Sequence, residues 1–149
     1  MSRKMKNLTL FVFLFYIFAV LTLTFIVRET MVLRTPDNRG VILQPFREFE
    51  AMLTKPDHFF WFMQIMLNIA LFIPFGFLLP TLNTRFKTPL ATVMTGFLFS
   101  GLIETMQYIT GRGLTEVDDV ITNTLGAAIG YSFYYIMRRA LALKAIWKV

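Results

Sequence analysis

Long apolar runs alternate with short polar segments along this chain, and the apolar runs have the length of membrane-spanning helices. The first, at residues 8–27, carries no charge and covers ~30 Å at the helical rise, which matches the hydrocarbon thickness of a bilayer. Basic residues before it also suit a signal peptide, but its apolar stretch is too long and no small-residue cleavage site follows. We therefore expect four transmembrane helices, at residues 8–27, 59–79, 89–109 and 117–137.

Two of these runs have unusual features. The run at 59–79 contains Pro74, which a spanning helix tolerates when neighbours satisfy the freed carbonyl, so we expect a kink there. The run at 117–137 is the weakest of the four because its first turns are polar.

The only long connection, residues 28–58, contains a second kind of pattern. After Pro45, apolar residues repeat at helical spacing with charged residues between them, at Phe46, Phe49, Met52 and Leu53. This pattern predicts a short amphipathic helix along the membrane surface, and a coiled loop folded over the bundle is the alternative. The chain is then one all-α domain over residues 1–149, an integral membrane bundle of four transmembrane helices with an amphipathic helix in the first outer loop.

Composition supports the membrane class. The 149 residues are 56% hydrophobic, which leaves too little polar surface for a soluble domain of this size. The absence of cysteine excludes disulfides and thiolate metal sites, and the single histidine, His58, is expected at the membrane interface. The net charge of +6 could indicate a nucleic-acid partner. Because the basic residues flank the apolar runs instead of forming an aromatic-interleaved patch, we expect no nucleic acid.

The basic residues also predict an orientation. With the N-terminus inside, the cytoplasmic flanks hold nine of the 15 Lys and Arg residues: Arg3, Lys4, Lys6, Arg85, Lys87, Arg138, Arg139, Lys144 and Lys148. The bias is modest, since the long outer loop is also basic. We expect both termini in the cytoplasm and residues 28–58 outside.

Polar side chains occur on the last two runs at helical spacing. One face of the third helix is expected to hold Gly96, Ser100, Glu104 and Gln107, and one face of the fourth Asp119, Asn123, Gly126 and Gly130. Small residues four apart let membrane helices approach closely, so we expect these faces to meet in a tight hairpin with a polar pocket near the outer boundary. Asn68, on the second helix, is expected to close the pocket from below.

Polar groups at membrane depth are costly and usually functional, so these residues are candidates for a binding site. The candidate ligand-binding residues are Asn68, Ser100, Glu104, Gln107, Arg112, Glu116, Asp119 and Asn123. The uncharged members could equally form interhelical hydrogen bonds.

The charged candidates each have a second interpretation. Glu104 needs a partner at its depth, for which Arg112 is the obvious choice, and Arg112 could also bind a phosphate or headgroup. Glu116, Asp118 and Asp119 begin a helix, where carboxylates cap free N–H groups. Capping explains Asp118 better than Asp119, which lies on the glycine face.

The chemistry open to such a site is limited. Paired carboxylates can act as acid and base, which makes Glu104 and Asp119 the candidate catalytic residues. Oxygen ligands could hold a hard cation, so Mg²⁺ or Ca²⁺ is a candidate cofactor, but the spacing does not define a ligand set. The sequence contains no nucleophile motif, phosphate-binding loop or metalloprotease pattern. Whether the chain is an enzyme stays open.

Three stretches resemble the VanZ-like family of bacterial integral membrane proteins. They are Gln44-Pro45-Phe46, the run Asn68 to Pro80, and the strip from Ser100 through Ile103-Glu104-x-x-Gln107, Gly111-Arg112 and Glu116-x-x-Asp119-Val120-x-x-Asn123-x-x-Gly126 to Gly130. Glu116 and Ile42 stand where that family usually has Asp and Asn. The resemblance implies a role in glycopeptide resistance, especially to teicoplanin, in the bacterial plasma membrane, but no settled reaction.

Three functions are consistent with these features. The first is binding of an envelope amphiphile, such as a lipid-linked cell-wall precursor or the lipid tail of a lipoglycopeptide, in an outward-facing polar pocket. The second is an intramembrane transferase or hydrolase that acts on lipid-linked precursors through its carboxylates. The third is a transporter, which four helices could form only as an oligomer.

Overall fold

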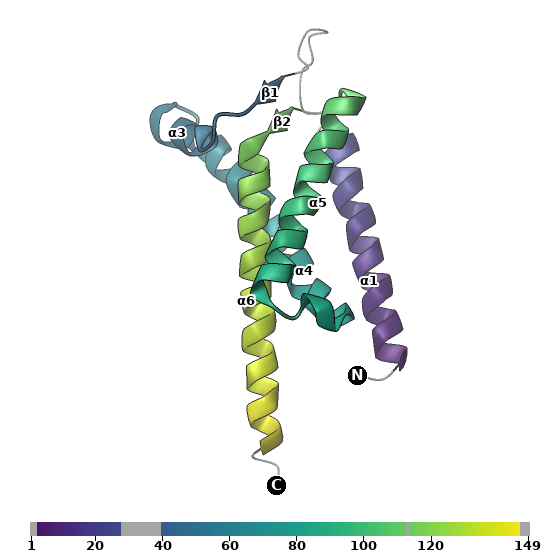
Figure 1. Ribbon diagram of the computed structural model, residues 1–149. Coiled ribbons are helices and arrows are strands. Elements are labelled where there is room, and N and C mark those ends of the chain that lie inside the picture. The colour runs from purple at the N-terminus through teal and green to yellow at the C-terminus, as the bar shows by residue number, and fades with distance from the viewer. Residues whose placement is uncertain (1–2, 28–39, 113, 147–149) are drawn as a thin grey trace.

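The computed structural model describes residues 3–27, 40–112 and 114–146, which form an elongated helical bundle (Figure 1). The elements in chain order are α1 (Arg3–Thr22), the π-helical turn η1 (Leu23–Val27), β1 (Val41–Ile42), α3 (Arg47–Thr54), α4 (His58–Leu82), the 3₁₀ turn η2 (Thr84–Phe86), α5 (Pro89–Thr110), β2 (Thr115–Glu116) and α6 (Val117–Ile146). The beginning of α1 and the end of α6 lie at the same end of the bundle.

Among the described residues, three helices are long and apolar enough to cross a membrane: Arg3–Ile26, His58–Leu82 and Pro89–Thr110. They coincide closely with the first three expected spans. The fourth expected span is a helix, since α6 starts at Val117, but α6 is not among the helices with the required length and hydropathy. Its carboxylates, Asn123 and tyrosines lower its hydropathy, so a bundle of four transmembrane helices is not confirmed.

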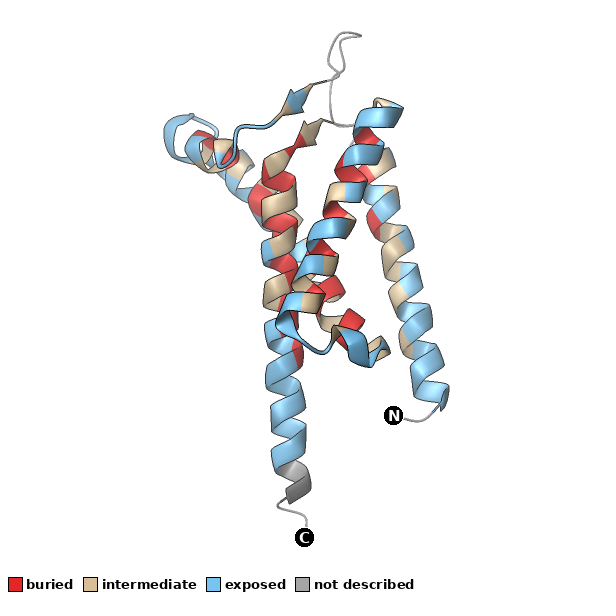
Figure 2. Cartoon of the chain, in the orientation of Figure 1, coloured by how far each residue is buried: buried red, intermediate tan, exposed pale blue. Residues whose placement is uncertain are grey.

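The side chains on the outside of the bundle are largely apolar. Phe11, Phe15 and Phe18 of α1 are exposed, as is Leu98 of α5. Buried residues follow the inner faces of the helices (Figure 2). The core consists of Val20, Phe72, Phe75, Leu79, Ile103 and Ala127. An apolar exterior around a small core is what a bilayer solvent requires, because lipid chains are as apolar as the core.

Glycines set the closest helix contact, and it lies between α4 and α6. A Cβ added to Gly126 or Gly130 would overlap the carbonyl oxygen of Ile69 or Ile73 on α4. A Cβ on Gly76 of α4 would overlap the backbone of Ala127. The prediction that the small-residue faces of the third and fourth runs meet is confirmed for Gly96 of α5, whose added Cβ would overlap that of Ala127 on α6, whereas Gly126 and Gly130 pack against α4. Small residues show which face packs closely but not against which helix.

The first helix packs across α4 and α5. The Tyr16 hydroxyl donates to the Leu71 carbonyl at 2.6 Å, and the Gln107 amide donates to the Thr24 carbonyl at 3.4 Å. The Tyr16 contact lies one turn before Pro74, and α4 continues through this proline as one helix.

The long connection between α1 and α4 contains both expected and unexpected structure. The amphipathic helix after Pro45 is confirmed as α3. Before it, β1 pairs in parallel with β2, with Val41 opposite Thr115 and Ile42 opposite Glu116, a pairing that no sequence pattern predicted. Residues 28–39 of the expected outer loop lie outside the described residues. The strand pair ties the connection to the start of α6.

Candidate functional site

The polar faces of α5 and α6 meet inside the bundle, as the helical spacing predicted. The Asn123 amide donates to the Ser100 hydroxyl at 2.9 Å, and both side chains are buried. One turn higher, the Glu104 carboxylate accepts a hydrogen bond from the Glu116 backbone N–H at 2.9 Å. These contacts place the buried polar groups of α5 directly against the first turns of α6.

A third helix supplies an amide to the same region. Asn68 of α4 donates through its amide nitrogen to Asp119 Oδ1 at 2.6 Å. Asp119 is completely buried. Asn68 therefore contacts the polar strip, whereas its closing of a pocket from below stays a prediction. The amide stabilises a carboxylate that would be costly to bury alone.

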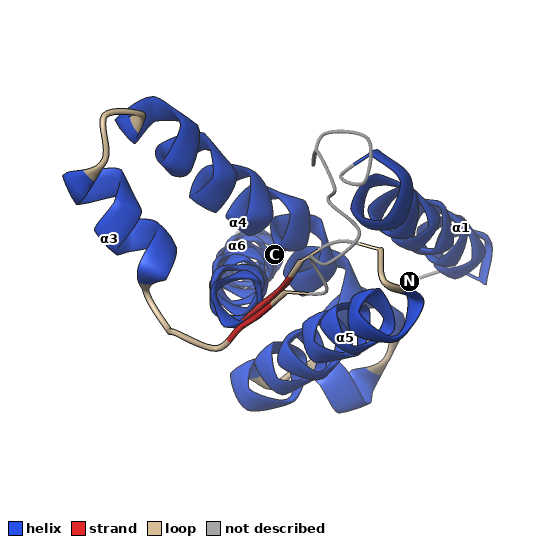
Figure 3. Cartoon of the chain, turned by 90° about the horizontal axis from the view of Figure 1, so that it is seen from above, coloured by secondary structure: helices blue, strands red, loops and turns tan. Residues whose placement is uncertain are grey.

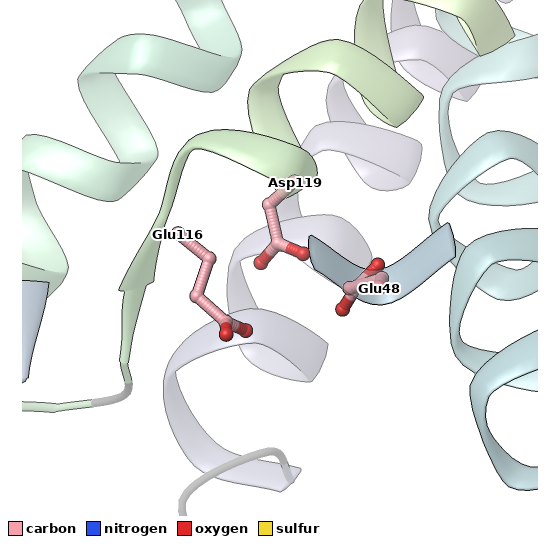
Figure 4. A group of neighbouring side chains, drawn as sticks. All are labelled: Glu48, Glu116 and Asp119. Atoms are coloured by element: carbon pink, nitrogen blue, oxygen red, sulfur yellow. The ribbon is translucent and has the colours of Figure 1, made fainter. Parts of the chain in front are cut away.

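Three carboxylates converge at this end of the bundle and form what we call the carboxylate cluster: Glu48, Glu116 and Asp119. Each offers an oxygen within 4.8 Å of the others, and all three residues are buried. Figure 4 shows their carboxylates turned toward one another from α3, β2 and the first turn of α6. Residues far apart in sequence thus meet because the β1–β2 pair and α3 fold back over α6.

Donors surround the carboxylate cluster. The Arg47 guanidinium lies 3.1 Å from Glu116 Oε1 and forms a partly buried ion pair. The Gln64 amide of α4 donates to Glu48 Oε1. Buried carboxylates require such donors or cations, because the low dielectric of the interior penalises a charge without compensation.

The cluster has dimensions that suit a small hard cation. Oxygen ligands of one Ca²⁺ lie at about 2.3–2.6 Å from the ion and so at most about 5 Å from one another. The oxygens of Glu48, Glu116 and Asp119 meet this limit. These three residues could therefore hold a divalent cation, or could share protons as an acid–base group.

We expected Asp118 to cap its own helix, α6. Its carboxylate instead binds the start of α3. Its two carboxylate oxygens accept the backbone N–H groups of Phe46 at 2.5 Å and Glu48 at 2.8 Å. Phe46 adopts a left-handed backbone with φ 64°, which a residue with a side chain rarely adopts. A buried carboxylate at the N-terminus of a helix complements the helix dipole, so Asp118 fixes α3 against α6.

The remaining candidates lie around the cluster. Gln107 is buried, and its amide contacts the Thr24 carbonyl in η1, directly after α1. Arg112 is exposed just after α5, so its pairing with Glu104 stays a prediction. His58 is exposed, and its Nδ1 lies 2.5 Å from the Met52 carbonyl oxygen.

Two buried acceptors near these groups have no donor among the described residues. Asn123 Oδ1 and Gln107 Oε1 accept no hydrogen bond from any residue that the structure describes. Buried polar atoms are nearly always paired, so each of these oxygens calls for a donor such as a water or a ligand hydroxyl.

Sequence reasoning missed Glu48 and Gln64. Gln64 stands four residues before Asn68 and so shares its helix face, a spacing that could have indicated it. Glu48 is one of the charged residues between the apolar positions of the predicted amphipathic helix, where a solvated position is the usual interpretation. Its burial depends on the contacts of α3, which no local pattern encodes.

Comparison with known proteins gives the chain a family. The model of the family described as VanZ/LLP1 matches residues 11–138. Protein VanZ from Enterococcus faecium is 33% identical over 96 residues, which are 59% of this chain and 54% of the relative. The chain thus aligns with about half of that relative's length. No solved structure matches it. With three helices long and apolar enough to cross a membrane, the chain is a bacterial membrane protein of the VanZ/LLP1 family.

Proposed function

We propose that this protein contributes to glycopeptide resistance, including resistance to teicoplanin, by binding an envelope amphiphile at the carboxylate cluster. The observation that carries the proposal is the convergence of Glu48, Glu116 and Asp119 at the end of the bundle where α4 and α6 begin. Charged groups buried beside membrane-spanning helices are expensive, and they mark functional sites more often than structural ones.

The chemistry of the site favours a ligand rich in hydroxyl or ammonium groups. Carboxylate oxygens accept hydrogen bonds from both groups. The oxygens of Asn123 and Gln107 that lack donors among the described residues add two further acceptors. A lipid-linked cell-wall precursor, or the sugar and lipid portion of a lipoglycopeptide, combines such a polar head with an apolar tail suited to the surrounding exposed surface.

In this proposal the site faces the outside of the plasma membrane. The start of α1 and the end of α6 lie at one end of the bundle, and the carboxylate cluster lies at the other (Figure 1). With the basic N-terminal flank in the cytoplasm, the cluster lies at the outer boundary. Here α6 is the fourth span, retained by its packing against α4 and α5.

The proposal is tested by substituting buried acids of the site in a strain whose teicoplanin resistance depends on this protein. We expect Glu104→Ala, Asp119→Ala and Glu48→Gln each to abolish resistance at unchanged membrane abundance. Glu50→Gln is the matched control, because Glu50 lies on the same helix as Glu48 but is exposed. Retained resistance in all three variants at equal abundance would rule out the site.

An enzyme is the second candidate, and the spacing of the cluster favours it specifically. Three carboxylate oxygens within 4.8 Å could hold Mg²⁺ or act as an acid–base group on a lipid-linked precursor. Purified protein incubated with radiolabelled lipid-linked precursor and Mg²⁺ would then form a labelled product, and Asp119→Asn would not. Binding of the precursor without any turnover would favour the binding function.

The transporter is the least favoured of the three. The buried charged side chains among the described residues are Glu48, Glu104, Glu116, Asp118 and Asp119, all near the same end of the bundle. A transport path requires polar groups along its whole length.

A further inference from the structure

The short helix α3 buries an acidic side chain against the bundle and leaves a large apolar side chain exposed. Glu48, 1% exposed, and Ala51 face the bundle, whereas Leu53 is 74% exposed and Phe46, just before the helix, is 58% exposed. A helix packed on a water-soluble core shows the opposite arrangement. The exposed apolar side chains favour an apolar medium on their side of α3.

Helical geometry divides α3 into three faces. Successive residues turn by ~100°, so Glu48 and Ala51 share one side and Phe49 and Leu53 lie on the opposite side. Glu50 and Thr54 lie between these two faces, and both are exposed and polar. One face thus meets protein, one is suited to lipid and one is suited to water, which is the arrangement of a helix at the level of lipid headgroups.

The apolar face of α3 continues onto a helix with the properties of a membrane span. Figure 3 shows α3 at the edge of the bundle beside the first turns of α4. There Phe59 and Phe60 are exposed, and α4 is long and apolar enough to cross a membrane. Exposed apolar side chains are thus present on both α3 and the neighbouring first turn of α4.

Charged and aromatic side chains mark the same level of the structure. Lys55, directly after α3, places its ammonium group 5.0 Å from the ring centre of Trp61 on α4. Tryptophan and lysine are the residues that anchor membrane proteins at the interface between acyl chains and headgroups.

We propose that α3 lies in the headgroup–acyl boundary of the bilayer, with Phe46, Phe49 and Leu53 among the acyl chains. Its opposite side presents Glu48 to the carboxylate cluster. The lipid layer and the carboxylate cluster are then separated only by the width of one helix.

The test uses the absence of cysteine from the chain, so that each spin label can be attached at one introduced cysteine. Leu53→Cys and Phe49→Cys probe the proposed lipid face, and Glu50→Cys and Thr54→Cys are matched controls on the same helix. The labelled proteins are placed in phosphatidylethanolamine–phosphatidylglycerol vesicles. Relaxation by oxygen and by a water-soluble nickel chelate is then compared at each position.

We expect collisions with oxygen to exceed those with the nickel chelate at least threefold at Leu53 and Phe49, and the reverse ratio at Glu50 and Thr54. Equal access of the nickel chelate at all four positions would overturn the proposal and place α3 in water. Shielding of Leu53 from both reagents would also overturn it, because a protein partner or second copy would then cover this face. The measurement needs no antibiotic or ligand, so its outcome is independent of the resistance test.

Discussion

At the scale of single residues, Asp118 connects two parts of the chain that lie far apart in sequence. Its carboxylate accepts two backbone N–H groups at the start of α3, and that helix carries Glu48 into the carboxylate cluster. Asp118 is not one of the three converging acids. It affects the site by positioning α3, the helix that carries Glu48.

Substituting Asp118 should loosen α3 selectively. In Asp118→Asn the amide can accept only through its one oxygen, so at least one charge-assisted hydrogen bond is lost, worth about 1.5–3 kcal/mol. We expect the distance distribution between spin labels at Leu53→Cys and Leu125→Cys, measured by pulsed electron paramagnetic resonance, to broaden. The same label pair in a Glu50→Gln background is the control and should keep a narrow distribution. An unchanged distribution in Asp118→Asn would show that Asp118 does not hold α3.

The hydrogen bond between Ser100 and Asn123 offers a second residue-scale prediction. Its loss in Ser100→Ala should lower the free energy of unfolding by about 0.6–2 kcal/mol, as for other interhelical hydrogen bonds in membranes. A double-mutant cycle with Asn123→Ala, measured by unfolding in mixed micelles, should give a coupling energy of this size. Ser132→Ala is the control, because the Ser132 hydroxyl is exposed and contacts only its own helix. A coupling energy near zero would mean that the two side chains do not interact.

Sequence alone could locate part of the candidate site. Ser100, Glu104 and Asn123 stand at helical spacings in apolar surroundings, and this pattern survives folding because a helix keeps residues four apart on one face. Glu48 reaches the site through a connection whose path depends on the β1–β2 pair and on Asp118. Contacts of this kind join distant segments and leave no periodic signal.

At the scale of elements, the close approach of α4 and α6 requires glycine at specific positions. Gly126→Ala would place a methyl group against the Ile69 carbonyl of α4, so the helices must separate. We expect a loss of about 1–3 kcal/mol of stability from such overpacking. Thermal unfolding in detergent, followed by circular dichroism, measures the change.

Gly101→Ala is the matched control for this substitution. A Cβ on Gly101 meets no atom within 4 Å, and alanine is the better helix former by about 0.5–1 kcal/mol. We therefore expect Gly101→Ala to raise the unfolding temperature and Gly126→Ala to lower it. Equal effects of the two substitutions would contradict the close contact.

Helix bounds were more predictable than helix partners. The apolar runs end at charged or proline-containing segments, so the starts at His58, Pro89 and Val117 fall within one residue of the expected positions. The sequence pattern did not show in the same way which helices pack against one another. The spacing of Gly126 and Gly130 marked a contact face, and these two glycines meet α4, whereas Ala127 between them meets Gly96 of α5.

At the scale of the whole molecule, the proposed orientation predicts which loops a membrane-impermeant reagent can reach. Single cysteines at Lys55, between α3 and α4, and at Thr84, between α4 and α5, lie at exposed positions on opposite ends of α4. In intact cells we expect a charged maleimide to label Lys55→Cys and not Thr84→Cys. Both should react after permeabilisation, which serves as the control. The reverse pattern would turn the carboxylate cluster toward the cytoplasm and contradict the proposed function.

The membrane class and the family were visible in the sequence, because hydropathy and motif spacing are properties of the chain itself. Whether α6 spans the membrane was not visible in the sequence. Its polar first turns and its tyrosines make it a weak span by composition, yet it packs along α4 and α5 in the bundle. Whether a helix of this kind resides in a bilayer depends on its neighbours, which composition does not describe.

The glycine contact between α4 and α6 has a consequence for how the protein is made. Ribosomes synthesise α4 before α6, so the docking surface for α6 exists before α6 emerges. A segment too hydrophilic to partition into lipid by itself can be kept there by a waiting partner whose backbone it touches. In the proposed topology of four spans, insertion of α6 would then be templated by α4, and defects on α4 would lead to misinserted α6.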